Sequence, residues 1–269
     1  MGVQLYVFDL DGVLYRMDEP IHAAVQAVGR LQGRGCRVFY ITNNSSKSRA
    51  DYVRKLGAIG VRAAEEEVMT SGYALGQWFL ERNEAGRTVY VIGESGLLDE
   101  LGAAGMRIVD YSEKETADYV AVGWDRQFSY EKLANAHISI SRGSKFIATN
   151  RDATFPDAGG RTLPGSGSLV AALVTSTGVQ PIAIGKPEPY TLDLILRRTG
   201  VSPDQCMVIG DRIDTDIAIG KRVGARTALV LTGIHTRWDL ERYPDLTPDL
   251  VLESLAELQR LESDPPSRS

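Results

Sequence analysis

Residues 5–15 read Leu-Tyr-Val-Phe-Asp-Leu-Asp-Gly-Val-Leu-Tyr. The apolar start of this stretch predicts a buried β-strand, and Asp9, Asp11 and Gly12 follow it directly. In a parallel α/β sheet, ligands bind outside the carboxyl ends of the strands. Two like charges this close need a cation, so the stretch indicates a cation-binding site. Asp and Gly are also common turn residues, and an ordinary strand-to-helix turn stays open at this point.

The composition is that of an ordinary soluble chain. Its 269 residues are 43% hydrophobic and 24% charged, which allows one large domain or two modest ones. A net charge of −5 does not indicate binding to nucleic acid or to an anionic membrane, so we expect a small-molecule partner. No run is apolar enough for a membrane span or a signal peptide, and Cys36 and Cys206 are expected to be free thiols. The predicted compartment is the cytoplasm.

Strands alternate with helices along the chain, which predicts an α/β fold with parallel sheets. Between residues 83 and 179 the pattern predicts further strands and helices, among them strands at 88–92 and 119–122 and a helix at 130–141. These are too many for one ordinary sheet. We therefore predict a doubly wound parallel sheet from residues 1–82 and 180–269, with a second α/β domain inserted at 83–179. A closing amphipathic helix is expected at residues 250–261.

Polar groups follow four of the predicted strands, namely Asp9 with Asp11, Thr42 with Asn43 and Asn44, Lys186, and Asp211 with Asp216. Each group alone has an ordinary explanation as a turn or a helix cap. We place all four strands, including the one at residues 182–184, in a single sheet. Their shared carboxyl edge then predicts one functional site.

The residue types at these strand ends fit phosphoryl transfer. Several carboxylates form the oxygen-rich site of a hard cation, most plausibly Mg²⁺. A Lys and a Thr hydroxyl can neutralise the other oxygens of a phosphoryl group in the transition state. One carboxylate is then free to attack phosphorus, while a second one transfers protons.

Four motifs resemble, in order, those of the haloacid dehalogenase-like phosphatases: Phe8-Asp9-Leu10-Asp11-Gly12-Val13, Ile41-Thr42-Asn43-Asn44, Gly185-Lys186-Pro187 and Gly210-Asp211-Arg212-Ile213-Asp214-Thr215-Asp216. The insertion resembles the large α/β cap of the branch with the NagD-type nucleotidases and the 4-nitrophenyl phosphatases. This resemblance covers essentially the whole chain. It implies a Rossmann-like core with a cap, and Mg²⁺-dependent hydrolysis of small phosphomonoesters through a phospho-aspartate.

The resemblance also implies a role for each motif residue. Asp9 would be the nucleophile, and Asp11 the general acid and base. The phosphoryl oxygens would be held by Thr42, by backbone N–H groups around Asn43 and Asn44, and by Lys186. The Mg²⁺ ligands would be Asp9, the Asp11 carbonyl and Asp211, with support from Asp216, whereas Asp214 either supports the metal or caps a helix.

The inserted domain should close over the site and carry the residues that contact the leaving group. The candidates are Trp124, Arg126 and Arg151, in loops after cap strands, and the segment Phe155-Pro156. Either arginine could meet a carboxylate or a second phosphate, although each loop could also be a solvated turn. Gly165-Ser166-Gly167 is expected to pack the cap. A homodimer through the cap is a further expectation from the resemblance.

Two alternatives remain at this stage. A phosphotransferase or sugar-phosphate mutase would use the same phospho-Asp but pass the phosphoryl group to a sugar. A non-catalytic receiver would accept phosphate on Asp and release little of it, yet receivers are single compact domains without an inserted lid. The sequence does not distinguish among phosphoglycolate, glycerol phosphate, nucleoside monophosphates and sugar phosphates as the natural substrate.

Overall fold

The computed structural model describes residues 2–156 and 161–258, and the chain in it forms two compact units. Unit 1 takes in the described residues of 1–42, 53–68 and 192–269, and unit 2 those of 43–52 and 69–191. The domain boundaries expected from the sequence stay a prediction. Each unit is described on its own below.

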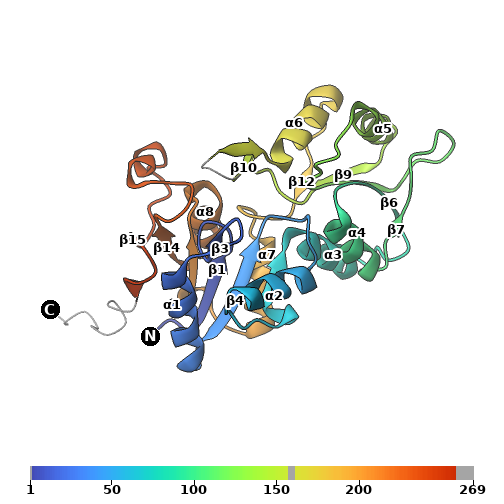
Figure 1. Cartoon of the computed structure of the whole chain (residues 1–269). Helices are drawn as coiled ribbons and strands as arrows, with labels where there is room; N and C mark the ends of the chain where they lie inside the picture. Colours follow the sequence, from blue (N-terminus) through green and yellow to red (C-terminus); the bar gives the residue numbers. More distant parts are fainter. Residues whose placement is uncertain (1, 157–160, 259–269) are drawn as a thin grey trace. The chain divides into compact units, whose positions relative to one another are not determined.

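The first sheet has six strands, in the order β15-β14-β13-β1-β4-β5. They are β1 (Leu5–Asp9), β4 (Arg37–Thr42), β5 (Val68–Thr70), β13 (Cys206–Gly210), β14 (Arg226–Val230) and β15 (Leu250–Leu252). The central strand β1 pairs in parallel with β13 on one side and with β4 on the other. In Figure 1, β1 and β4 lie side by side in blue. All five residues of β1 are buried, as in a sheet that is covered on both faces.

Short helices and turns connect these strands. Helix α1 (His22–Gly33) buries Ala24, Ala27, Val28 and Leu31, which recur on one helical face. Helix α8 (Ala218–Val223) follows a π-helical turn, η4 (Ile213–Ile217), and a small antiparallel hairpin joins β2 (Tyr15–Arg16) to β3 (Glu19–Pro20). Two helices, α2 (Arg49–Ala58) and α7 (Tyr190–Thr199), begin in unit 2 and end in unit 1. The 3₁₀ segments are η1 (Glu65–Glu67), η3 (Pro203–Gln205) and the longer η5 (Arg237–Arg242).

The second sheet belongs to unit 2 and has the order β12-β9-β8-β6-β7, with every pairing parallel. Its strands are β6 (Thr88–Ile92), β7 (Arg107–Ile108), β8 (Tyr119–Val122), β9 (Lys145–Ala148) and β12 (Ile182–Ala183). A separate hairpin pairs β10 (Thr154–Pro156) with β11 (Thr162–Pro164).

The alternation of side chains along these strands gives the second sheet two apolar faces. On one face, Val89 and Ala121 pack with Leu75 of α3 (Ser71–Glu81) and Leu97 of α4 (Ser95–Ala103). On the other face, the neighbouring strand residues pack with side chains of α5 (Tyr130–Ser141) and α6 (Ser166–Thr177). Helices therefore cover both faces of a parallel sheet, and the predicted fold class is confirmed.

Two of the sequence predictions are wrong. The strand before Lys186 pairs with β9 in the second sheet, and not with the strands that carry the acidic residues. It is a two-residue edge strand, too short for local pattern to fix its partner. The helix expected at 250–261 begins instead as strand β15, which pairs with β14; residues 259–261 lie outside the described residues.

None of the helices in the described part of the chain is both long and apolar enough to cross a membrane.

Candidate active site

Three carboxylates of unit 1 come together at the carboxyl ends of two adjacent strands. Asp9 is the last residue of β1, Asp211 follows β13, and Asp216 lies in the π-helical turn behind it. One oxygen of each lies within 4.8 Å of the others. The three residues are only 8%, 1% and 1% exposed. The structure thus brings together three of the four acids that the sequence assigned to the metal.

The register of the sheet explains why Asp9 and Asp211 meet. Phe8 pairs with Ile209, so the chain leaves both strands at the same level of the sheet. The turn that follows folds Asp216 back, and its Oδ2 accepts a hydrogen bond of 3.0 Å from the Arg212 backbone N–H. Such single π-helical turns occur frequently at functional sites.

A loop after β14 holds Asp211 in place, and sequence analysis missed it. The Ile234 backbone N–H donates to Asp211 Oδ2 at 2.6 Å, and the His235 N–H donates to the Asp211 carbonyl at 3.1 Å. The only available signal was position, because the loop follows the strand next to β13 in the sheet.

Three positions beside these acids are glycines, and any larger residue there would overlap an acid side chain. A Cβ at Gly210 would lie 2.1 Å from Asp216 Cγ, and one at Gly233 would lie 2.0 Å from Asp211 Oδ2. Gly12 has a φ of +77°, and its Cβ would lie 2.6 Å from the same oxygen. Glycine is thus favoured at position 12 for two reasons, its positive φ and its close approach to Asp211.

His235 fixes the start of the π-helical turn. Its Nδ1 accepts a hydrogen bond of 2.8 Å from the Ile213 backbone N–H, so this nitrogen carries no proton in the structure. Burial lowers the pKa of the imidazole, which favours the neutral form. His235 is therefore a structural neighbour of the acids.

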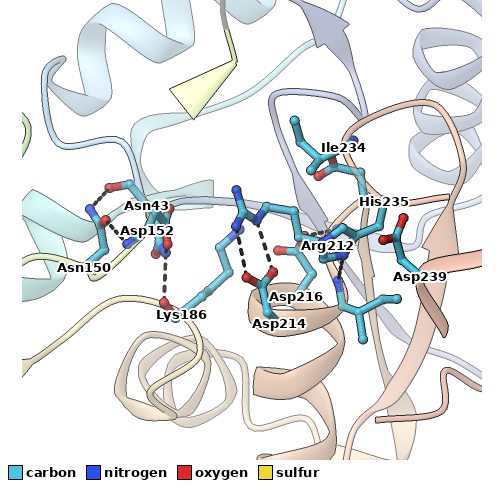
Figure 2. Close-up of polar contacts among 12 residues, drawn as sticks. Asn43, Asn150, Asp152, Lys186, Arg212, Asp214, Asp216, Ile234, His235 and Asp239 are labelled. Carbon is cyan, nitrogen blue, oxygen red and sulfur yellow. Dashed lines mark hydrogen bonds and ion pairs between the residues drawn. The ribbon is translucent and has the colours of Figure 1, made fainter. Parts of the chain in front are cut away.

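Asp214 lies apart from the three acids, although it is only two residues from Asp216. Its two oxygens accept from the Arg212 guanidinium at 3.2 and 3.0 Å, as Figure 2 shows. The sequence left open whether Asp214 or Asp216 would support a metal. The geometry favours Asp216, because Asp214 is paired with an arginine.

Asp11 lies two residues beyond Asp9 and outside the three-acid cluster. Burial raises the pKa of its carboxyl to about 6, although the charge of Lys55 and a hydrogen bond from the Met17 backbone act in the opposite direction. A carboxyl group with a pKa near 6 exchanges its proton close to neutral pH. This property suits a general acid and base.

The three-acid cluster fits a divalent cation. Three buried carboxylates at this separation repel one another unless a cation offsets their charge. Their oxygens are hard ligands, which Mg²⁺ and Ca²⁺ prefer over the nitrogen and sulfur ligands of transition metals. The donor set present in the chain therefore agrees with the predicted Mg²⁺.

Of the remaining predicted phosphate-binding residues, Thr42, Asn43 and Lys186 are buried, and Asn44 is half-buried. Thr42 ends β4 and is 6% exposed. In unit 2, Asn43 is 7% and Lys186 3% exposed, and the Asn43 side-chain amide donates to the Lys186 carbonyl at 2.9 Å. The Asn44 side chain accepts from the Ser46 N–H at 2.9 Å and so stabilises the turn of this loop.

The three residues expected to contact a leaving group have partners within unit 2. Trp124 stacks on Phe155 with ring centroids 4.2 Å apart. The Arg126 guanidinium binds both oxygens of Glu94 at 2.8 and 2.6 Å. Arg151 donates to the Pro181 carbonyl at 2.9 Å. The tight packing expected at Gly165-Ser166-Gly167 is confirmed, because a Cβ at either glycine would lie 2.3 Å from a backbone oxygen of residue 151 or 152.

Comparison with known proteins gives consistent matches along the chain. Residues 6–107 match the profile of a family described as haloacid dehalogenase-like hydrolase, and residues 183–258 match a second HAD-hydrolase-like profile. The chain is 38% identical over 253 residues to an acid sugar phosphatase of Staphylococcus saprophyticus, covering 94% of this chain and 95% of that protein.

Solved structures show the same similarity in three dimensions. A p-nitrophenyl phosphatase from Archaeoglobus fulgidus has a TM-score of 0.89 and 36% identity, over 97% of this chain and 99% of that one. A glycerol phosphate phosphatase from Mycobacterium tuberculosis, in complex with magnesium, has a TM-score of 0.87 and 32% identity, over 95% of this chain and 76% of that one.

Proposed function

Because the chain belongs to the haloacid dehalogenase-like hydrolases and is a phosphatase, we propose that it hydrolyses small phosphomonoesters with Mg²⁺ through a phosphorylated Asp9. The observation that carries this proposal is the buried cluster of Asp9, Asp211 and Asp216 at the ends of adjacent parallel strands. The magnesium complex of the similar M. tuberculosis phosphatase supports the choice of ion. The substrate is a small phosphorylated metabolite.

Asp9 and Asp11 divide the chemistry between them. An oxygen of the ionised Asp9 attacks phosphorus, and the bond from phosphorus to the leaving-group oxygen breaks. Asp11 gives its proton to that oxygen. In the second half, Asp11 takes a proton from water, the water oxygen attacks the phosphorus of the acyl phosphate, and Asp9 is released together with inorganic phosphate. The raised pKa of Asp11 supports both proton transfers.

The negative charge of the phosphoryl group must be offset while an anionic carboxylate approaches it. Asp9, Asp211, Asp216 and the Asp11 carbonyl would hold Mg²⁺, which supplies positive charge to the phosphoryl oxygens when bound. Thr42 and the backbone N–H groups around Asn43 and Asn44 would donate to the same oxygens. Lys186 would add a second positive charge, a role supported by its place in the third motif.

The loops of unit 2 would select the leaving group. Trp124 stacks on Phe155, and the Arg126 guanidinium carbon lies 5.3 Å from the Trp124 ring centroid, so this aromatic and cationic group suits the C–H face of a sugar or an anionic leaving group. Arg126 and Arg151 are exposed at neighbouring loops. Arg126 would meet an anionic leaving group partly in competition with Glu94, since its Nε and Nη2 already contact that carboxylate.

The test is turnover of 4-nitrophenyl phosphate with and without Mg²⁺, by the wild type and by Asp9→Asn. We expect repeated Mg²⁺-dependent turnover in the wild type and a loss of at least about 10³-fold in the variant, because it lacks the nucleophile. Asp204→Asn replaces an exposed aspartate in η3 and serves as the matched control with wild-type activity.

The same samples distinguish the alternatives. Acid-quenched wild type should carry a hydroxylamine-sensitive phosphate that Asp9→Asn lacks. Retained activity in Asp9→Asn would refute the phospho-aspartate mechanism. Phosphate held stoichiometrically without turnover would favour a receiver, and conversion of a sugar phosphate to its isomer without phosphate release would favour a mutase.

A further inference from the structure

Asn43 uses both hydrogens of its side-chain amide inside unit 2. Nδ2 donates to Asp152 Oδ1 at 2.9 Å and to the Lys186 carbonyl at 2.9 Å. Figure 2 shows the three labelled residues joined in this way. Because both donors are engaged, the orientation of the amide is fixed. The contribution of Asn43 to phosphate binding must then come from the backbone of its loop, and not from its side chain.

Asn150 holds the same residue from the other side. Its Nδ2 donates to the Asn43 carbonyl at 2.7 Å, and its Oδ1 accepts from Ser166 Oγ at 2.6 Å and from the Asp152 backbone N–H at 3.0 Å. Asn150 is 3% exposed and Ser166 is 2% exposed. A buried network in which every member is satisfied favours a single arrangement of the groups that it joins.

Close backbone contacts reinforce this arrangement. A Cβ at Gly185 would lie 2.5 Å from Asn43 Oδ1, so the amide rests directly against the residue before Lys186. The Gly185 N–H donates to the Thr149 carbonyl at 2.7 Å, which ties the lysine segment to the end of β9. The second and third motifs of the chain therefore meet at the loop after β9.

The loop that begins at Asn43 packs closely against Gly123, which follows β8, and against Gly96 of α4. A Cβ at Gly123 would lie 2.4 Å from Ser45 Oγ, and one at Gly96 would lie 2.3 Å from the backbone carbon of Lys47. The Gly96 N–H also donates to the Ser46 carbonyl at 3.2 Å. Contacts this close leave the loop little freedom to shift relative to the rest of unit 2.

We infer that Asp152 and Asn150 are positioning residues, which fix the phosphate-binding loop and Lys186 relative to each other through Asn43. This inference rests on the proposed function, because it concerns how the same phosphoryl group is held. It changes the role of the loop at 150–152, which sequence analysis assigned to the leaving group. Two of its three side chains belong to the network, and only Arg151 is exposed.

The experiment compares Asp152→Ala with Asp152→Asn in the turnover assay. Asp152→Ala removes the acceptor for Asn43 and should lower kcat about 10- to 100-fold, because small misplacements of binding groups have effects of this size. Asp152→Asn keeps an acceptor oxygen and should remain within about threefold of the wild type. Asp152→Glu, which keeps the charge but moves the carboxylate by one methylene, should fall in kcat like the alanine variant.

Asp118→Ala is the structural control. Asp118 lies in the same unit and accepts from the Thr88 N–H and Oγ1, both at 2.8 Å, with no contact to Asn43. Its loss should lower the unfolding temperature and leave kcat at 25 °C unchanged. If Asp152→Ala behaved in the same way, Asp152 would be structural only and the inference would be wrong.

A double-mutant cycle tests the route through Asn43. In an Asn43→Ala background the hydrogen bond to Asp152 is already absent, so adding Asp152→Ala should lower kcat by less than about twofold. Multiplicative losses would overturn the inference while leaving the proposed function intact. A wild type without Mg²⁺-dependent turnover would instead refute the proposed function itself.

Discussion

Substitution of Gly233 tests whether the loop after β14 controls the acid cluster. In Gly233→Ala the new Cβ would lie 2.0 Å from Asp211 Oδ2 and 2.4 Å from its Cγ. Ordinary contact between such atoms needs about 3.5 Å, so one of the groups must move by more than an ångström. Because the new methyl group is fixed to the backbone, we expect the Asp211 side chain to move, and it then loses the 2.6 Å hydrogen bond from Ile234.

The expected loss follows from this displacement. A misplacement of about 1 Å near the reacting groups costs on the order of 10²-fold in rate, which corresponds to about 2.7 kcal/mol of activation free energy. Gly233→Ala should therefore lower kcat/KM for 4-nitrophenyl phosphate by about 100-fold. The Mg²⁺ concentration that gives half-maximal activity should rise as well, because Asp211 is a proposed ligand.

Gly29→Ala is the matched control for this substitution. Gly29 is an exposed residue of α1, and a Cβ there meets nothing within 4 Å. This variant should keep wild-type kinetics and gain about 0.5–1 kcal/mol of stability, since alanine is the better helix former. Wild-type kcat/KM and an unchanged Mg²⁺ requirement in folded Gly233→Ala, checked by thermal unfolding, would refute the reasoning.

Two further predictions concern the neighbouring acids and the acid stability of the fold. Asp216→Asn should raise the Mg²⁺ concentration for half-maximal activity about 10- to 100-fold. Asp214→Asn should change the same concentration by less than about threefold. Equal shifts in the two variants would contradict the assignment of Asp216 to the metal. Burial raises the pKa of Asp249, but hydrogen bonds from Lys221 and Thr227 outweigh it, and the folded-state pKa is lowered. Its stabilisation is therefore present above the unfolded pKa of about 3.9 and is lost as the pH falls below it. Asp249→Ala should be about 0.5–1 kcal/mol less stable at pH 7 by urea unfolding, with a smaller difference at pH 3.

Local pattern was sufficient for most elements of the fold. The strands at 88–92 and 119–122 and the helix at 130–141 have the bounds predicted from the sequence. Apolar runs bounded by turns, and helical spacing, are local properties of the chain. Strand β15 is an exception, because Leu250–Leu252 is stabilised as a strand by its pairing with β14, which no local pattern contains.

The partners of strands could not be predicted in the same way. The segment before Lys186 looks like any other strand that ends in a polar loop, and the sequence gives no sign that it pairs with β9. Sheet order depends on contacts between distant residues. For the same reason the loop at Gly233 was missed, since its importance lies in its distance from Asp211 and not in its own residue types.

The choice between Asp214 and Asp216 shows what spacing alone leaves open. Both follow the same strand, and in a regular helix neither would be favoured by type or charge. The π-helical turn gives Asp216 the hydrogen bond from the Arg212 backbone, and the side chain of that arginine binds Asp214. Arg212 thus contacts the two acids in different ways, Asp216 through its backbone N–H and Asp214 through its side chain. In Arg212→Ala, Asp214 loses this partner and can compete for the ion, so the Mg²⁺ concentration for half-maximal activity should change. Arg212→Lys should restore the wild-type value only if a single positive charge is enough to pair with Asp214.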